Sequence, residues 1–106
     1  MNELKKGKVK EILKALMNGK TNDNRFDNAE QIEIVITNFL KMNLFDTNKF
    51  KVTVNEKPEN EIDNIDIDYL LVGSIENLEN GDIFDFDIYY TKTRANKIYP
   101  VEFIIQ

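Results

Sequence analysis

Five carboxylates that follow a hydrophobic run are the side chains best suited to chemistry or to binding. They lie within residues 68–90, a stretch that contains no lysine or arginine. They are Glu76, Glu79, Asp82, Asp85 and Asp87. Asp85 and Asp87 alternate with hydrophobic residues, so on a strand they would share one face, about 7 Å apart. Two such carboxylates can act as acid and base in glycoside hydrolysis, and a cluster of carboxylates can bind a basic partner.

The rest of the composition argues against an enzyme. The 106 residues include no histidine and no cysteine, which removes the usual general base near neutral pH, the thiolate nucleophile and the zinc–thiolate site. Ser74 stands in G-S-I rather than in the G-x-S-x-G turn of a serine hydrolase. A chain this short, without tryptophan, also has little from which to build a substrate cleft. We therefore expect no enzymatic activity and no catalytic residues.

Patterns for binding metals and nucleotides are missing as well. The run "DNIDID" at residues 63–68 has the carboxylates that Ca²⁺ prefers. Counted from Asn64, however, the positions that an EF-hand loop fills with glycine and glutamate hold Tyr69 and Ile75. Neither phosphate-binding glycine motif, G-x-x-x-x-G-K or G-x-G-x-x-G, occurs. We expect no metal site and no cofactor.

Charge is distributed unevenly along the chain. The formal net charge is −5, but residues 1–20 carry +4 and residues 56–88 carry −10. The acidic segment is either a solvated sheet face whose charges prevent edge pairing or a docking face for a basic groove. The lysines near the start are either solvated or a surface for phosphate or acidic protein. A nucleic-acid surface is disfavoured there because no aromatic residues lie among the lysines.

The first half of the chain predicts two amphipathic helices. The first spans about residues 2–18 and ends at Asn18-Gly19, a left-handed stop. The second spans about residues 28–44, after a polar linker, and begins at a capping box formed by Asp27 and Glu30. Hydrophobic residues recur at helical spacing in both helices: Val9, Ile12, Leu13, Leu16 and Met17 in the first, and Ile32, Val35, Ile36, Phe39 and Leu40 in the second.

The second half of the chain predicts strands. Residues 50–54 alternate as a half-buried strand, and Pro58 among charged residues makes residues 55–66 a loop. Residues 69–75 are hydrophobic on both faces, as in a strand covered on both sides or one at the centre of a packed sheet. Gly73 inside this strand indicates a bulge or a close approach of another group to the backbone.

A hairpin is predicted next. Asn80-Gly81 favours a type I′ turn, which would pair Glu79 with Asp82. The return strand, residues 83–90, alternates hydrophobic residues with Asp85 and Asp87.

The last predicted strand spans residues 97–105 and follows a turn near Ala95-Asn96. Pro100 cannot donate a backbone hydrogen bond, so this strand is expected at an edge of the sheet. Alternation places four hydrophobic side chains of this strand on one face: Tyr99, Val101, Phe103 and Ile105. The chain is thus predicted to be a single α+β domain, with two N-terminal helices packed on one face of a mainly antiparallel four-stranded sheet.

Part of the sequence resembles a known type of domain. The segments "VITNFLKMNLFDTNKFKVTV", "DYLLVGSI", "GDIFDFDIYYTKT" and "NKIYPVEFI" follow the layout of the extracytoplasmic α/β domains of the TolB amino-terminal, CsgG and LpoB type. The similarity covers about residues 30–105. The opening strand of that type is replaced here by the lysine-rich helix. The resemblance implies a non-enzymatic interaction module of a periplasmic or outer-membrane assembly, with no catalytic residues.

We therefore expect a non-enzymatic protein-interaction domain that binds a partner with a basic surface through the acidic hairpin and sheet face. The alternative is a small inhibitor from a phage or mobile element, either an anti-defence or a toxin-immunity protein, that blocks a basic nucleic-acid-binding site by acidic mimicry. We expect no direct binding of nucleic acid, no membrane span and a cytoplasmic location, or an extracytoplasmic one if an export signal has been removed. Pairing of the edge strand with a second copy of the chain stays open.

Overall fold

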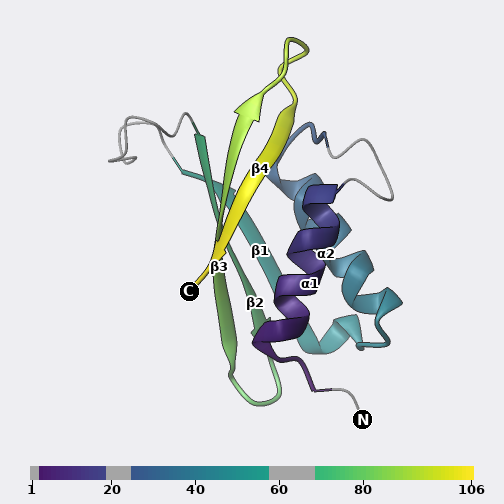
Figure 1. The fold of residues 1–106 in the computed structure, drawn as a ribbon. Coiled ribbons are helices and arrows are strands. Elements are labelled where there is room, and N and C mark those ends of the chain that lie inside the picture. The colour runs from purple at the N-terminus through teal and green to yellow at the C-terminus, as the bar shows by residue number, and fades with distance from the viewer. Residues whose placement is uncertain (1–2, 19–24, 58–68) are drawn as a thin grey trace.

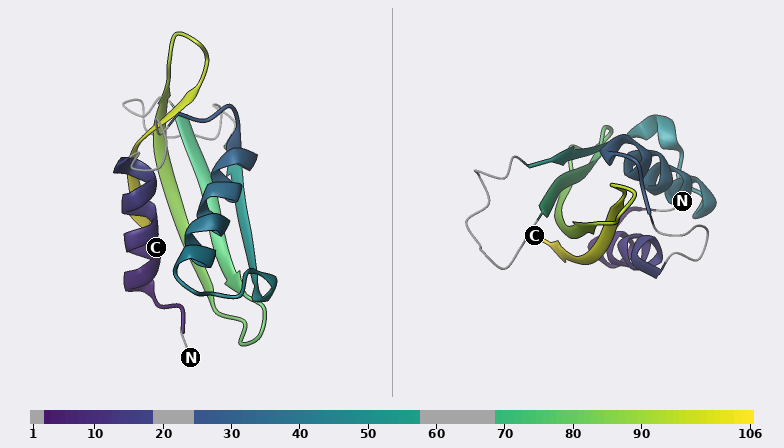
Figure 2. Two further views of the ribbon diagram at one scale, coloured as in Figure 1. Left: turned by 90° about the vertical axis from the view of Figure 1, so that its right-hand side faces the viewer. Right: turned by 90° about the horizontal axis from the view of Figure 1, so that it is seen from above.

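The computed structural model describes residues 3–18, 25–57 and 69–106, and these form two layers (Figures 1 and 2). Two helices lie on one face of a four-stranded antiparallel sheet with the order β1-β2-β3-β4. The elements are α1 (Lys6–Asn18), α2 (Ala29–Met42), the short 3-10 helix η1 (Thr47–Lys49), β1 (Phe50–Glu56), β2 (Tyr69–Asn77), β3 (Ile83–Lys92) and β4 (Ile98–Ile105). The predicted α+β fold is confirmed.

Some predictions concern residues outside the described ranges. Gly19 of the predicted helix stop, Pro58 and the "DNIDID" run belong to them. Asn18 does end α1, as predicted. Residues 55 and 56, predicted as the start of a loop, still belong to β1.

The first helix begins at Lys6 rather than near residue 2, and it packs against both β4 and α2 (Figure 2). Its predicted stripe is confirmed, because Val9, Ile12, Leu13 and Leu16 are all buried. Burial of such a stripe, rather than intrinsic propensity, holds a helix of this length in place. Its partner β4 is the last strand of the chain, so α1 links the two ends of the described sequence.

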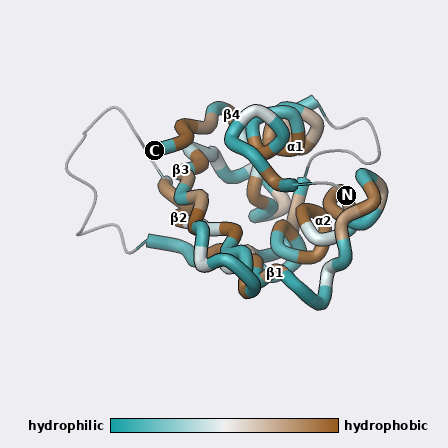
Figure 3. Tube along the Cα trace, turned by 90° about the horizontal axis from the view of Figure 1, so that it is seen from below, coloured by the Kyte–Doolittle hydropathy of each residue, from teal (hydrophilic) through white to brown (hydrophobic). Residues whose placement is uncertain are grey.

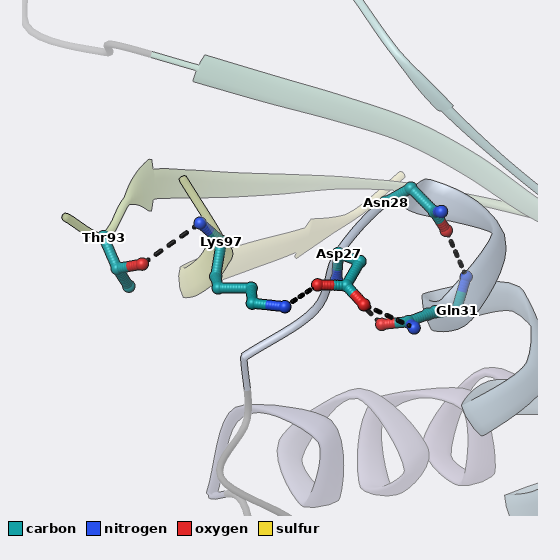
Figure 4. Close-up of polar contacts among 5 residues, drawn as sticks. All are labelled: Asp27, Asn28, Gln31, Thr93 and Lys97. Carbon is teal, nitrogen blue, oxygen red and sulfur yellow. Dashed lines mark hydrogen bonds and ion pairs between the residues drawn. The ribbon is translucent and has the colours of Figure 1, made fainter. Parts of the chain in front are cut away.

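The second helix packs mainly against β1, and it begins one residue later than the predicted capping box. The N-cap is Asn28, whose Oδ1 accepts a hydrogen bond from the Gln31 N–H at 3.0 Å. Gln31 Oε1 in turn accepts from the Asp27 N–H at 2.7 Å (Figure 4). The predicted box of Asp27 and Glu30 is therefore wrong.

The cap moves because the segment before α2 is attached to the sheet. Phe26 and Ile98 exchange two backbone hydrogen bonds, of 2.9 and 2.7 Å. The Asp27 carboxylate pairs with Lys97 Nζ at the start of β4 (Figure 4). These contacts tie Phe26 and Asp27 to the sheet, and Asn28, which is extended, caps the helix instead.

The loop between β2 and β3 is longer than predicted. The last strand pair is Glu76 with Ile83, and the Asn77 N–H donates to the Asp82 carbonyl at 2.8 Å. Four residues, 78–81, therefore form the loop. A type I′ turn requires positive φ at both central residues, but Gly81 has φ 81° and Asn80 does not share this conformation, so the predicted turn is wrong.

The side chain of Asn77 explains the wider loop. Its Oδ1 accepts hydrogen bonds from the N–H groups of Glu79, at 2.9 Å, and Asn80, at 3.3 Å. An asparagine in this role replaces the backbone bonds of a tighter turn. The register differs from the predicted one by an even number of residues, so Asp85 and Asp87 keep the predicted face.

A bulge in β4 overturns the predicted alternation of that strand. Tyr89 pairs with Glu102 while Tyr90 pairs with Pro100, so Val101 is an extra residue. Such a residue reverses the side-chain alternation. Phe103 and Ile105 pack against the core as predicted, whereas Tyr99 and Val101 are 37% and 57% exposed. The predicted turn before β4 is confirmed by the bond from the Thr93 N–H to the Lys97 carbonyl, 2.9 Å.

The core lies between the helices and the sheet, and hydrophobic stretches from both layers contribute to it (Figure 3). In the sheet its centre is formed by Leu71, Ile75, Phe86 and Ile88, all fully buried. Gly73 is part of this packing, because a Cβ there would lie 2.5 Å from the Phe86 ring and 2.9 Å from the Thr53 carbonyl oxygen. Of the two predictions for Gly73, the close approach is correct, and the register shows no bulge at this position.

Candidate functional site

The five predicted site residues fall into two groups. Glu76, Asp85 and Asp87 lie within strands, and Glu79 and Asp82 lie at the hairpin loop. The two groups are continuous through β2 and β3, but only the first belongs to the sheet face.

The loop group is partly neutralised. Glu79 forms an ion pair with Lys49 Nζ at 3.1 Å, with both side chains more than half exposed to solvent. The Asp82 N–H donates to Asn80 Oδ1 at 2.9 Å, and its carboxylate is exposed. These contacts shape the loop, and exposed pairs of this kind contribute little free energy.

The strand group lies on the sheet face that points away from α1 and α2, which we call the open face. No described helix lies on this face (Figure 2). Alternation from the core positions assigns it the following strand residues: Lys51, Thr53, Asn55, Leu70, Val72, Ser74, Glu76, Ile83, Asp85, Asp87, Tyr89, Thr91, Tyr99, Glu102 and Ile104. Within the strands it therefore has four carboxylates and one lysine.

Cross-strand neighbours set the surroundings of each carboxylate on the open face. Glu76 lies opposite Lys51 and Ile83. Asp85 is exposed and lies opposite Ser74. Neither Asp85 nor Asp87 forms an ion pair with another described residue.

Asp87 lies in the middle of a row of three residues across the open face, and the sequence did not predict this row. It stands between Val72 of β2 and Ile104 of β4, and its Oδ2 accepts a hydrogen bond from Gln106 Nε2 at 3.0 Å. Val72 is 41% exposed and Ile104 is 45% exposed.

Hydrophobic side chains that alternate with polar ones on an uncovered sheet face indicate an interaction surface. The available signal is the hydrophobic character of residues 69–75 on both faces, which predicts a strand covered on both sides or one at the centre of a packed sheet. The second alternative is correct, because β2 is an inner strand and helices cover one side of it alone.

The carboxylates of the open face lie on an uncovered surface and not in a hollow of the described structure. Asp85 and Asp87 lie side by side on an uncovered surface, and none of the five predicted residues lines either of two hollows found elsewhere. One hollow, of about 570 Å³, lies between the start of α2 and the edge of β1, and the other, of about 510 Å³, lies between α1 and the end of β4. Among the described residues, no group of three or more carboxylates is arranged to hold a metal ion.

Comparison with models of protein families, with curated proteins and with solved structures finds no match for this chain. The resemblance to TolB-type domains therefore stays a prediction. Within the described ranges, neither helix has the length and hydrophobicity needed to cross a membrane.

Proposed function

We propose that this chain is a non-enzymatic protein-interaction domain whose open face binds a partner protein with a basic surface. The observation that carries the proposal is the row of Val72, Asp87 and Ile104 across three strands. It combines exposed hydrophobic area with a carboxylate that has no ion pair among the described residues. A hydrophobic centre with a charged surround is the usual anatomy of a protein interface.

Charge defines the partner more closely. Asp85, Glu76 and Glu102 surround the row, and Lys51 is the one cation of the open face within the strands. A complementary partner presents lysine or arginine around a hydrophobic patch. Such pairing mainly raises the rate of association and suppresses wrong partners.

The narrower alternative, an inhibitor that mimics nucleic acid, receives less support from this geometry. A mimic competes for a channel that grips phosphates through lysine and arginine. On the open face, however, Val72, Ile83 and Ile104 are exposed between the carboxylates. Mixed hydrophobic and acidic character favours the general interaction domain over a mimic of a polyanion.

The proposal is tested with charge-reversed variants. The wild-type chain and the variant Asp85→Lys with Asp87→Lys are immobilised and exposed to extract of the source cell, and captured proteins are identified and then purified. The matched control is Glu3→Lys with Glu30→Lys, which makes the same change of net charge at exposed positions outside the sheet.

We expect the purified partner to bind the wild type and the control, and to bind the open-face variant at least about tenfold more weakly. Affinity for the wild type should also fall as salt increases. A partner that binds the open-face variant as tightly as the wild type, with no dependence on salt, contradicts the proposal.

A further inference from the structure

A second surface, with the opposite charge, lies at the edge of the sheet. The hollow of about 510 Å³ between α1 and β4 is lined by Lys6, Gly7, Lys10, Phe103, Ile104 and Ile105. Phe103 and Ile105 provide a hydrophobic floor that continues into the core. Gly7 lies in open surroundings, because a Cβ at this position would have no atom within 4 Å.

The backbone of β4 presents hydrogen-bonding groups to this hollow. The Gln106 N–H donates to the Asp85 carbonyl at 3.0 Å, so residues 106 and 85 form a hydrogen-bonded pair. In an antiparallel ladder such pairs alternate with pairs that do not bond each other. The register then makes Ile104 and Glu102 bond to β3, while the N–H and C=O groups of Phe103 and Ile105 point away from the sheet.

The same alternation of hydrogen-bonded and non-bonded pairs explains the backbone contacts at the start of β4. Ile98 points outward and exchanges its two hydrogen bonds with Phe26, at 2.9 and 2.7 Å. Pro100 also points outward, at a position where no N–H is needed. The edge of β4 is therefore closed at its start. At Phe103 and Ile105 it has no described backbone partner.

The lysines beside this open segment are electrostatically unfavourable in the isolated chain. Lys6 and Lys10 are exposed, one helical turn apart, and neither forms an ion pair with another described residue. Like charges at this spacing destabilise a helix. The first turn of α1 contains no acidic residue, so cations stand at the positive end of the helix dipole. An anionic group bound here would relieve both effects.

We propose that the open segment of β4 accepts an extended, acidic segment of a partner protein as an added strand. The N–H and C=O groups of Phe103 and Ile105 bond to the backbone of that segment. Its alternate carboxylates point toward the helix layer and pair with Lys6 and Lys10. The site differs from the open face in its backbone groups, its lysines and the charge that it takes, although Ile104 borders both surfaces.

Synthetic peptides provide the test. The probe is a peptide as long as β4, eight residues, in which valine alternates with glutamate and both ends are blocked. The control peptide replaces glutamate by lysine. Binding is measured by fluorescence anisotropy of a labelled peptide, and the exchange of individual backbone amides is followed by NMR.

Amide exchange distinguishes an added strand from a loose electrostatic contact. At a peptide concentration about 100 times Kd, we expect the amides of Phe103 and Ile105 to exchange up to about 100-fold more slowly. The amides of Glu102 and Ile104, which already face β3, should change far less. Binding of the glutamate peptide without protection of Phe103 and Ile105 overturns the proposal.

Charge reversal tests the role of the lysines. The variant Lys6→Glu with Lys10→Glu should bind the glutamate peptide at least about tenfold more weakly and should gain affinity for the lysine peptide. The control Lys14→Glu with Lys41→Glu makes the same change of net charge outside the hollow and should stay within about twofold of the wild type. All four lysines are exposed, so the variants are expected to fold.

Two further results would overturn the proposal. One is equal affinity of the wild type for the glutamate and lysine peptides. The other is protection of the Phe103 and Ile105 amides that appears in the protein alone and rises with its concentration, which would identify a second copy of this chain as the occupant of the edge.

Discussion

The two edges of the sheet have the same backbone chemistry and opposite surroundings. On β1, the outward N–H of Phe50 donates to the Thr47 carbonyl in η1, and that of Val54 donates to Glu33 Oε2 in α2 at 2.8 Å. On β4, the neighbouring helix offers Lys6 and Lys10 instead. A carboxylate accepts hydrogen bonds, but a lysine can only donate them. Helix α2 therefore supplies an acceptor to an outward N–H of its edge, whereas the lining lysines of α1 supply none to Phe103 and Ile105.

The largest expected effect comes from substituting proline at two neighbouring positions of β4, one whose N–H faces β3 and one whose N–H faces outward. Ile104→Pro removes an N–H that faces β3 and should lower the free energy of unfolding by about 3 kcal/mol. Ile105→Pro removes an outward N–H and should cost about 1 kcal/mol, mainly through lost packing. Urea denaturation measures both values. Equal losses of unfolding free energy in the two variants would show that the Ile105 N–H does not point outward.

A smaller effect is expected at the edge formed by β1. Glu33→Ala leaves the Val54 N–H without its acceptor and should cost about 1–3 kcal/mol, because an unsatisfied, partly buried donor is unfavourable. Glu33→Gln keeps a carbonyl oxygen and should cost less than about 1 kcal/mol. Denaturation gives the loss, and amide exchange at Val54 shows whether the edge has opened. A glutamine variant as unstable as the alanine variant would mean that Glu33 acts through its charge.

The smallest effect concerns the flank of α1 that faces away from β4. A hydrogen bond from Lys8 and its charge, with a weaker effect of Lys14, hold the pKa of Glu11 below its ordinary value. Lys8→Met should raise this pKa toward the ordinary value, and Lys6→Met should leave it nearly unchanged. NMR titration of the Glu11 carboxyl group measures both shifts.

The sign of the linked effect on stability follows from the lowered pKa. The Lys8–Glu11 interaction is present at neutral pH and is lost as the pH falls through the pKa of Glu11 in the folded chain. Because Glu11 is exposed, the stability change should be too small to see in a denaturation curve. A large shift on Lys6→Met would mean that the lysines beside β4 are coupled to the paired flank.

Local patterns predicted the elements of the fold and missed how neighbours adjust them. The stripe of Val9, Ile12 and Leu16 and the hydrophobic residues of β2 are properties of single elements, and the structure confirms them. The cap of α2 depends on Phe26 bonding to Ile98, far away in the sequence. The bulge at Val101 likewise depends on the pairing of β4 with β3. Such long-range contacts leave no periodic signal.

The charge pattern of the sequence predicted the carboxylates of the candidate site. The exposed hydrophobic residues beside them were not predicted. Asp85 and Asp87 lie on an uncovered face as their alternation indicated, because an even change of register preserves the face. Glu79 and Asp82, predicted to pair across a tight turn, instead lie at a wider loop that the Asn77 side chain stabilises. The exposure of Val72 could not be predicted, since a hydrophobic residue on a strand fits a covered and an uncovered face equally well.

The packing of α1 on β4 has a consequence for how the protein is made. During synthesis α1 is made before all the other described elements, whereas β4, one of the two elements that it packs against, is the last of them. α2 meets its partner β1 much earlier in translation. We therefore expect a nascent chain that stops before residue 98 to lack the contacts of α1 with β4, so that the packing of α1 is completed late.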